Sequence, residues 1–214
     1  MNTIILNGSP KAQNGNSEIF IREFVKEMTN PYEIKYIAKE DPCVLAKYIQ
    51  PFDVIIIVLP LYVHAMPGIV MKFIEQLEPF TQAGTSIGFI LQFGFPESSQ
   101  ADYIEPYFNS LAKQLNCNYL GTVLKGEAAG IYMMPQFVTK KIFKQLNALG
   151  RIYNQTYTFD KEIMEALKTP YVLKKSTIKY FNFMSKLGVT NIFWNGALKK
   201  NNALDQRYDK PFLS

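Results

Sequence analysis

Cysteine and histidine are scarce in this 214-residue chain, which has two cysteines and one histidine. Cys43 and Cys117 stand far apart, and neither belongs to a Cys-x-x-Cys pair. The sequence therefore supports neither a disulfide framework nor a zinc site, and it has no cysteine cluster for an iron–sulfur centre. We expect no metal centre and two reduced, structural thiols.

Two common nucleotide-binding fingerprints are also missing. No glycine is followed at the required spacing by Gly-Lys-Ser or Gly-Lys-Thr, and no Gly-x-Gly-x-x-Gly occurs. A mononucleotide hydrolase of the Walker type and the usual dinucleotide-binding fold both lose support from this absence.

Long hydrophobic runs are absent as well. The longest apolar stretch, residues 54–63, is interrupted by Pro60 and is far shorter than the roughly 18 residues that a membrane-spanning helix needs. No basic segment precedes the apolar residues 3–6, which are too few for the core of a signal peptide. We expect no membrane span and a cytoplasmic protein.

The chain carries a formal net charge of +5 and has a pI near 9.0, which raises the question of an acidic partner. The excess is thinly spread, however. Lysines cluster at positions 140, 141 and 144 and again at 174, 175 and 179, in patterns typical of solvated helix faces. We expect no nucleic-acid partner.

The N-terminal stretch joins an apolar strand to a polar loop. Residues 3–6 form an unbroken apolar run, typical of a strand that is buried on both faces of a sheet. The loop that follows is polar and contains glycine: Gly8, Ser9, Pro10, Lys11, Asn14, Gly15, Asn16 and Ser17. We expect Asn16 or Ser17 to cap the next helix, whose free N–H groups and dipole favour an anion such as phosphate. A simple capped turn explains these residues equally well when the loop is taken alone.

Strand and helix patterns alternate along the rest of the chain. Further strands are expected at residues 32–37, 53–59, 86–93 and 118–124, and helices at 67–77, 99–115 and 137–153, with Pro106 implying a kink or a late start in the second of these. This alternation predicts an α/β fold with a doubly wound, five-stranded parallel sheet in the order 2-1-3-4-5. In that topology a ligand lies beyond the carboxyl ends of the strands, where the order reverses between strands 1 and 3.

Two further loops fall at that predicted edge of the sheet. After the third strand come Pro60, Leu61, Tyr62 and Val63, and after the fourth come Phe93, Gly94 and Phe95. A tyrosine, apolar side chains and backbone amides suit the face and the edge of a flat heteroaromatic ring. Either loop alone is weak evidence, and the loop after the third strand is also compatible with a hydrophobic segment that packs on its own helix.

Together the three loops resemble those of the flavodoxin-like NAD(P)H-dependent FMN reductases, a family that includes quinone reductases. NGSPKAQNGNSE (7–18) is similar to the family's phosphate loop, PLYVHAMPGIVMKFIEQL (60–77) to its ring-contacting loop and the following helix, and GFPES (94–98) to a third contact. The resemblance covers roughly residues 1–155. It implies that Ser9, Lys11, Asn16 and Ser17, with Asn14 and Gly15 of the same loop, hold the phosphate of bound FMN. It also implies that residues 60–63 line the isoalloxazine ring and that Gly94, with Phe93 and Phe95, meets its far side.

The resemblance implies an activity in which NAD(P)H gives a hydride to FMN and the protein reduces a quinone, a flavin, a nitro or azo compound, or a similar small-molecule acceptor. No side chain is assigned a catalytic role. Two alternatives stay open: a flavodoxin-type single-electron carrier, and a flavin-free binding or regulatory module of the same fold. Because such carriers usually dock through acidic surfaces, a pI near 9.0 counts against the first alternative.

Two features depart from the family pattern or extend beyond it. His64 stands where a short polar residue is expected, and we favour a polar loop side chain over a proton-transfer role. Residues 156–214 are expected to form a helical extension, rich in aromatic residues, with helices near 162–167 and 172–187. We expect this extension to pack on the first domain (1–155) or at the interface of a homodimer or tetramer, with a position on a membrane surface as the alternative.

Overall fold

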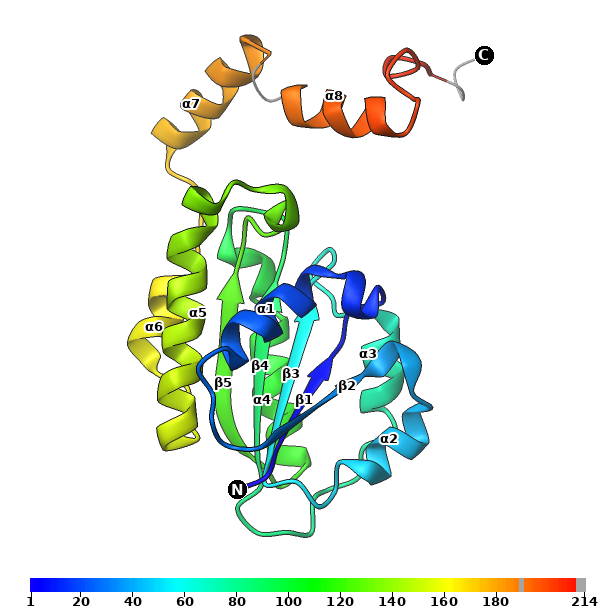
Figure 1. Ribbon diagram of the computed structural model, residues 1–214, viewed down its shortest axis with the longest axis vertical. Coiled ribbons are helices and arrows are strands. Elements are labelled where there is room, and N and C mark those ends of the chain that lie inside the picture. Colours follow the sequence, from blue (N-terminus) through cyan, green and yellow to red (C-terminus); the bar gives the residue numbers. More distant parts are fainter. Residues whose placement is uncertain (189–190, 211–214) are drawn as a thin grey trace. The chain divides into compact units, whose positions relative to one another are not determined.

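A parallel sheet forms where the sequence has its apolar runs (Figure 1). Its strands are β1 (Thr3–Asn7), β2 (Tyr32–Tyr36), β3 (Val54–Pro60), β4 (Ser86–Gln92) and β5 (Asn118–Lys125), in the order β2-β1-β3-β4-β5. All neighbouring pairs are parallel, and every residue of β1 and β3 is buried. Continuous apolar sequences suit these two strands because helices cover both faces of the sheet. The predicted fold class and strand order are confirmed.

The computed structural model describes residues 1–188 and 191–210, without the side chains of residues 192 and 193. It contains two compact units, Met1–Val172 and Leu173–Ser214. The boundary expected from the sequence, after residue 155, lies inside helix α5 (Gln136–Thr156). Helix α6 (Lys161–Leu167) belongs to the first unit, because Leu167 joins the buried core and the Gln145 amide donates to the Ala166 carbonyl at 3.0 Å.

The helices of the first unit form one layer on each face of the sheet. One layer contains α1 (Asn16–Val25), α5 and α6, and the other contains α2 (Pro42–Tyr48), α3 (Gly68–Ile74) and α4 (Ile104–Gln114). Short 3-10 helices lie at Ala12–Asn14, Ile37–Lys39, Ser98–Ala101 and Ile131–Met133. Each layer buries its own apolar cluster against the sheet. Helix α4 begins late, as Pro106 predicts, whereas α2 was not predicted.

Helix α5 crosses α1 at very close range. At Gly150 the two backbones approach so closely that an added Cβ atom would overlap the carbonyl oxygen of Phe24. Beside this crossing, the Phe24 and Tyr153 rings lie 5.4 Å apart, and the Tyr153 hydroxyl forms a 2.8 Å hydrogen bond with the Thr3 hydroxyl. Burial raises the pKa of Tyr153. Close packing at this crossing therefore fixes α5 over the first strand of the sheet.

Among the described residues of the second unit, 173–188 and 191–210, lie helices α7 (Lys175–Lys186) and α8 (Asn191–Lys200). Helix α7 falls within the range predicted from the sequence, and α8 was not predicted. No residue of α7 is buried. Across residues 1–188 and 191–210, no helix combines the length and the apolar character that crossing a bilayer requires.

The two cysteines differ in environment, and we expect them to differ in reactivity. Cys43 is exposed, whereas Cys117 is half-buried, and burial raises the pKa of the Cys117 thiol to about 11. Because the thiolate is the reactive form, Cys117 should be alkylated at least about 10-fold more slowly than Cys43 near about pH 8 in the native protein. Mass spectrometry of peptides from a timed iodoacetamide reaction measures both rates, and unfolded protein is the control. Equal rates in the native protein would contradict this expectation.

Candidate functional site

A cavity of about 590 Å³ opens at the carboxyl ends of β1, β3 and β4. Its volume lies within the range of roughly 300–1,000 Å³ that is usual for small-molecule sites. All the site residues predicted from the sequence except Ser17 line it: Ser9, Lys11, Asn14, Gly15, Asn16, Pro60, Leu61, Tyr62, Val63, Phe93, Gly94 and Phe95. Three loops that are far apart in the sequence therefore meet around one space.

The first loop is held in shape by Asn7, the last residue of β1. Its amide nitrogen donates to the Glu18 carboxylate at 3.0 Å and to the Ala12 carbonyl at 3.4 Å, while its amide oxygen accepts from the Ser9 N–H at 3.0 Å. The side chain of Asn7 is fully buried, so these bonds replace all its contacts with water. Asn7 therefore ties the strand, the loop and the first turn of α1 together, a role that the sequence analysis did not assign.

The start of α1 differs from the prediction. Gly15 occupies the N-cap position, and no side chain caps the helix. The prediction that Asn16 or Ser17 caps it is wrong because both residues already belong to the helix. The Asn16 amide instead donates to the carbonyl oxygens of Ala128 (2.8 Å) and Ala129 (3.2 Å), which joins this loop to the one after β5. With no capping side chain, the first N–H groups of the helix remain available to an anion.

Ser17 and Ser9 contribute two buried hydroxyl groups near this helix start. Ser17 is fully buried, and its hydroxyl has no hydrogen-bond partner in the described part of the chain. The Ser9 hydroxyl accepts a 3.2 Å bond from the Lys11 N–H, and Ser9 is also buried. An added Cβ atom at Gly15 would overlap the Ser9 hydroxyl, so only glycine fits there without a rearrangement. Lys11 is exposed and makes no ion pair with any described residue.

The second loop contains a tight turn in an unfavourable backbone conformation. The Tyr62 N–H donates to the Ala65 carbonyl at 2.8 Å, and the Ala65 N–H donates to the Tyr62 carbonyl at 3.0 Å. The two central residues, Val63 and His64, have φ angles of +46° and +65°. Such turns favour asparagine and glycine, and a left-handed β-branched valine costs roughly 1–3 kcal/mol. The turn holds Tyr62 and Val63 at the cavity with half or more of each side chain exposed.

His64 lies in this turn but does not line the cavity. Its Nδ1 atom lies 3.0 Å from the Gln100 carbonyl oxygen, which only accepts, so Nδ1 carries the hydrogen. The imidazole also meets the Tyr103 ring edge-on, with centroids 6.3 Å apart. These contacts anchor the turn to the segment after β4.

The third loop is anchored to the loop after β5. The Phe93 N–H donates to the Lys125 carbonyl, and the carbonyl oxygens of Phe93 and Phe95 accept from Ala128 and Glu127. Gly94 lies between the two phenylalanines, and its N–H has no partner among the described residues. Phe93 is buried, whereas Phe95 is 56% exposed. The loop therefore places at the cavity a glycine whose backbone donor is unused among the described residues, beside an exposed aromatic ring.

No protein-family model matches the sequence, and no curated protein matches it significantly. Solved structures do match the fold. They include an NADPH-quinone reductase from P. pentosaceus, with 16% identity and a TM-score of 0.55 over 73% of this chain and 99% of that one. An FMN-dependent NADH-azoreductase from Bacillus anthracis in complex with FMN has 14% identity and a TM-score of 0.53 over 72% and 99%. A Trp repressor binding protein from Bacillus subtilis has 16% identity and a TM-score of 0.54 over 69% and 96%.

The chain has the flavodoxin-like fold. In this fold the order of the strands reverses between β1 and β3, and the cavity lies at their carboxyl ends, where ligands of doubly wound sheets bind. The similar structures belong to proteins with different names and activities, and a fold alone does not determine a function. The function therefore has to be inferred from the residues that line the cavity.

Three residues that line this cavity were not predicted: Gln92, Ala129 and Tyr132. Gln92 is the buried polar residue that ends β4, and the other two follow β5. The predicted strand order already indicated these residues, because the carboxyl end of β5 lies at the same edge of the sheet as the carboxyl ends of β3 and β4. Applying the edge rule to every strand would have included the segment 126–134.

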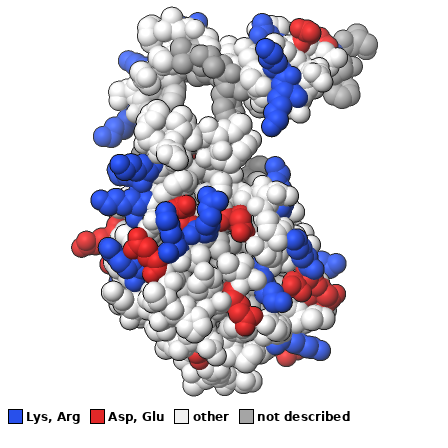
Figure 2. Space-filling view, viewed as in Figure 1, with Lys and Arg blue, Asp and Glu red and all other residues white. Residues whose placement is uncertain are grey.

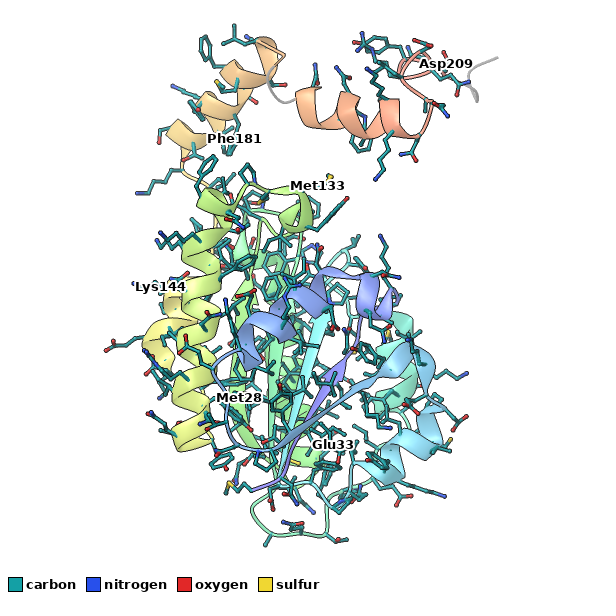
Figure 3. All side chains as sticks on the ribbon, viewed as in Figure 1. Met28, Glu33, Met133, Lys144, Phe181 and Asp209 are labelled. Atoms are coloured by element: carbon teal, nitrogen blue, oxygen red, sulfur yellow. The ribbon has the colours of Figure 1, made fainter. Side chains whose placement is uncertain are left out.

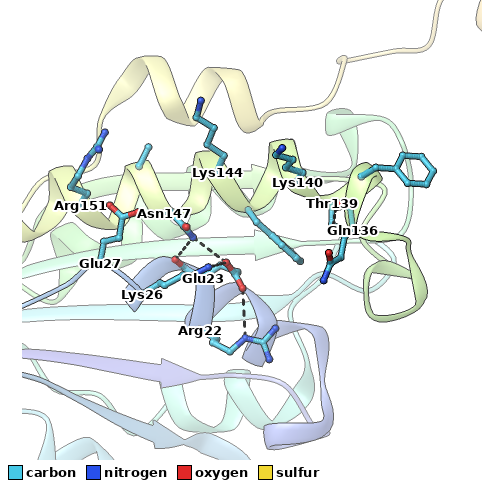
Figure 4. A pocket seen from close by; sticks show the side chains of 13 residues that line it. Arg22, Glu23, Lys26, Glu27, Gln136, Thr139, Lys140, Lys144, Asn147 and Arg151 are labelled. Atoms are coloured by element: carbon cyan, nitrogen blue, oxygen red, sulfur yellow. Dashed lines mark hydrogen bonds and ion pairs between the residues drawn. The ribbon is translucent and has the colours of Figure 1, made fainter.

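A larger hollow, of about 850 Å³, lies between α1 and α5 on one face of the flavodoxin-like sheet (Figure 4). The buried Glu23 carboxylate at its base accepts from the Asn147 amide at 3.1 Å and lies 3.6–3.7 Å from Lys26 and Arg22. Two basic residues that line the hollow therefore balance the negative charge of the Glu23 carboxylate. Five of its 13 lining residues are lysines or arginines, and none of the 13 belongs to the three loops. It does not share the chemistry of the cavity at the strand ends.

Proposed function

We propose that the protein is an FMN-dependent oxidoreductase that uses NAD(P)H to reduce a small-molecule acceptor such as a quinone, a flavin, or a nitro or azo compound. One observation carries the proposal. Three separate loops meet around one cavity, with features that suit an anion on the first loop and exposed aromatic groups with a free backbone donor on the other two. A molecule with a phosphate and a flat polar ring matches both parts.

The residues of the first loop fit a phosphate group. Lys11 supplies a positive charge that forms no ion pair with a described residue, Ser9 supplies a hydroxyl, and α1 supplies its uncapped N-terminus. Ser17 does not line the cavity, but its buried hydroxyl lies in the first turn of the same helix and has no hydrogen-bond partner among the described residues. A buried polar group without a partner costs free energy, and a bound oxygen atom would remove that cost.

The residues of the other two loops fit a flavin ring. Tyr62 and Phe95 offer aromatic contacts, and the Gly94 N–H is a free donor for the polar edge of the ring. Bound FMN would supply the hydride and electron chemistry itself. The protein would bind the ring, orient it and present backbone donors where negative charge develops. No side chain of the chain has to act as a nucleophile.

Titration of the purified protein with FMN tests the proposal. We expect saturable binding of one FMN per chain. Changes in the visible spectrum and quenching of flavin fluorescence measure this binding. Riboflavin, which lacks the phosphate, is the matched ligand and should bind at least about 10-fold more weakly because it forms no charge-assisted bonds to the first loop. Absence of any FMN binding would leave the flavin-free module as the function.

Anaerobic mixing with NADPH and with NADH then separates a reductase from a single-electron carrier. Rapid bleaching of the bound flavin by either nucleotide supports the reductase, and an unchanged flavin spectrum supports the carrier. The net charge of the chain does not distinguish the reductase from the carrier, because the positive excess lies outside the first unit. Residues 173–214 contain eight of the 23 basic residues but only two of the 18 acidic ones. The flavin unit itself, residues 1–172, therefore has a formal charge of −1. We retain the expected homodimer or tetramer as part of the proposal, and light scattering of the purified chain measures it.

A further inference from the structure

The chain divides its charge unevenly between its two units. Residues 173–214 contain eight lysines and arginines and only two aspartates, which gives +6, while residues 1–172 have a net charge of −1. Figure 2 shows this difference: basic and acidic side chains are interspersed over the first unit, and basic ones dominate over α7 and α8. The whole positive excess of the chain therefore belongs to the second unit.

Helix α7 separates its apolar side chains from its basic ones. Tyr180, Phe183, Met184 and Leu187, the last of them the C-cap, follow the i, i+3, i+4, i+7 spacing of one helical face. The three lysines within the helix, Lys175, Lys179 and Lys186, share a different face, because the same periodicity brings them together. The helix is thus amphipathic with an aromatic side and a purely basic side.

The apolar face is uncovered in the structure. Tyr180, Phe183 and Leu187 are each about 60% exposed, and Phe181 projects from the same helix (Figure 3). Helix α8 repeats the combination, with Trp194 62% exposed and Lys199 and Lys200 in its last turn. Exposed aromatic side chains next to lysines are a pattern typical of helices that lie in the interface of a lipid bilayer.

We propose that the second unit binds the surface of an anionic lipid bilayer, with the aromatic face of α7 in the interfacial layer and its lysines toward the lipid headgroups. A bilayer accommodates both faces at once, because apolar side chains enter the acyl boundary and lysines meet negative headgroups. A nucleic acid would neutralise the lysines but leave Phe183 and Leu187 in water. A second copy of the unit would cover the apolar face but bring two charges of +6 together. Charge complementarity therefore favours the anionic bilayer.

Sedimentation of the full-length protein with vesicles tests this proposal. We expect binding to vesicles of mixed phosphatidylcholine and phosphatidylserine, and at least about 10-fold weaker binding to phosphatidylcholine alone, because the lysines need anionic lipid. Trp194 is the one tryptophan of the chain, so its emission reports on the second unit directly. A blue shift of that emission with the anionic vesicles is expected, since the indole leaves water. None of these measurements requires bound flavin or NAD(P)H.

Paired variants identify the surface responsible. Lys175→Gln, Lys179→Gln and Lys186→Gln together should weaken vesicle binding by about 100-fold. The matched control, Lys140→Gln, Lys141→Gln and Lys144→Gln on α5, removes the same charge and should leave binding within about two-fold, because it leaves the proposed surface intact. Phe183→Ser with Leu187→Ser should abolish the fluorescence shift, whereas Phe137→Ser with Val138→Ser, also exposed, should not.

Three kinds of result would overturn the proposal. One is equal binding to neutral and anionic vesicles, or none to either. Another is an equal loss of vesicle binding in the α7 and α5 lysine variants, which would show that binding depends on the net charge of the protein and not on α7. The third is a dimer that dissociates in the Phe183→Ser and Leu187→Ser variant, or binding of duplex DNA in preference to anionic vesicles, which would assign the surface to a different partner.

Discussion

Replacement of Ser9, Asn16 and Ser17 together with alanine should weaken FMN binding by about 100-fold while the sheet stays folded. Each net hydrogen bond contributes about 0.5–1.5 kcal/mol, so three lost bonds amount to about 3 kcal/mol. None of these side chains belongs to the two apolar clusters that stabilise the sheet. Fluorescence titration with FMN measures the affinity, and circular dichroism checks the fold. Flavin affinity within about three-fold of the unchanged protein would place the phosphate elsewhere.

The single substitutions make this prediction sharper because the three side chains have different contacts. Ser17→Ala removes a buried hydroxyl that has no partner among the described residues, so the flavin-free protein should keep its stability or gain up to about 1 kcal/mol, while FMN binding weakens by about 10-fold. Asn16→Ala loses the bonds to Ala128 and Ala129 and should lower both stability and FMN affinity. Ser98→Ala is the matched control, because Ser98 is also buried without a partner among the described residues but lies after β4, outside the first loop and the start of α1. It should not change FMN affinity.

The largest loss of stability is expected from Gly150→Ala, at about 3 kcal/mol of the free energy of unfolding. Alanine in a helix interior is intrinsically better than glycine by about 1 kcal/mol, so propensity alone predicts the opposite sign. Geometry decides the outcome here, because the added Cβ would overlap the Phe24 carbonyl oxygen and push α5 away from α1. That displacement would disturb the packing of Phe24 and Tyr153 beneath it.

Urea denaturation followed by circular dichroism measures this change. The matched control is Gly68→Ala at the start of α3, where an added Cβ meets nothing within 4 Å. Gly68→Ala should leave the stability unchanged or raise it by up to about 1 kcal/mol. If both substitutions had the same effect, the close crossing of α1 and α5 would not be a determinant of stability.

The sheet could be predicted from the sequence because its central strands have strong and simple patterns. Residues 3–6 and 53–59 are unbroken apolar runs, and burial on both faces of a parallel sheet requires such runs. The alternation of strands with amphipathic helices then restricts the topology to very few possibilities. The strand order in turn brings the three loops to one edge, so most lining residues of the cavity were identified from their loops.

The contacts that shape the loops could not be predicted in the same way. Asn7 reads as the polar end of a strand, and nothing in the sequence indicates that its amide reaches both Ser9 and Glu18. Asn16 has a side chain that is typical of capping residues, yet its amide donates to a carbonyl group more than 100 residues later in the sequence. In both cases hydrogen bonds formed in the folded protein, and not the local preference of asparagine, determine the position of the side chain. Helix α2 is different, because Asp41 before Pro42 is a recognisable helix start and its carboxylate does cap the helix.

The parallel sheet also sets the order in which the site is completed during synthesis. Strand β1 and the first loop are translated before the other four strands, but β1 pairs with both β2 and β3, and β3 ends only at Pro60. The last lining residue of the cavity, Tyr132, follows β5. A nascent chain shorter than this holds the apolar strands without their final partners, a state that is exposed to aggregation. The whole sheet must therefore be translated before any ligand can stabilise the fold through this cavity.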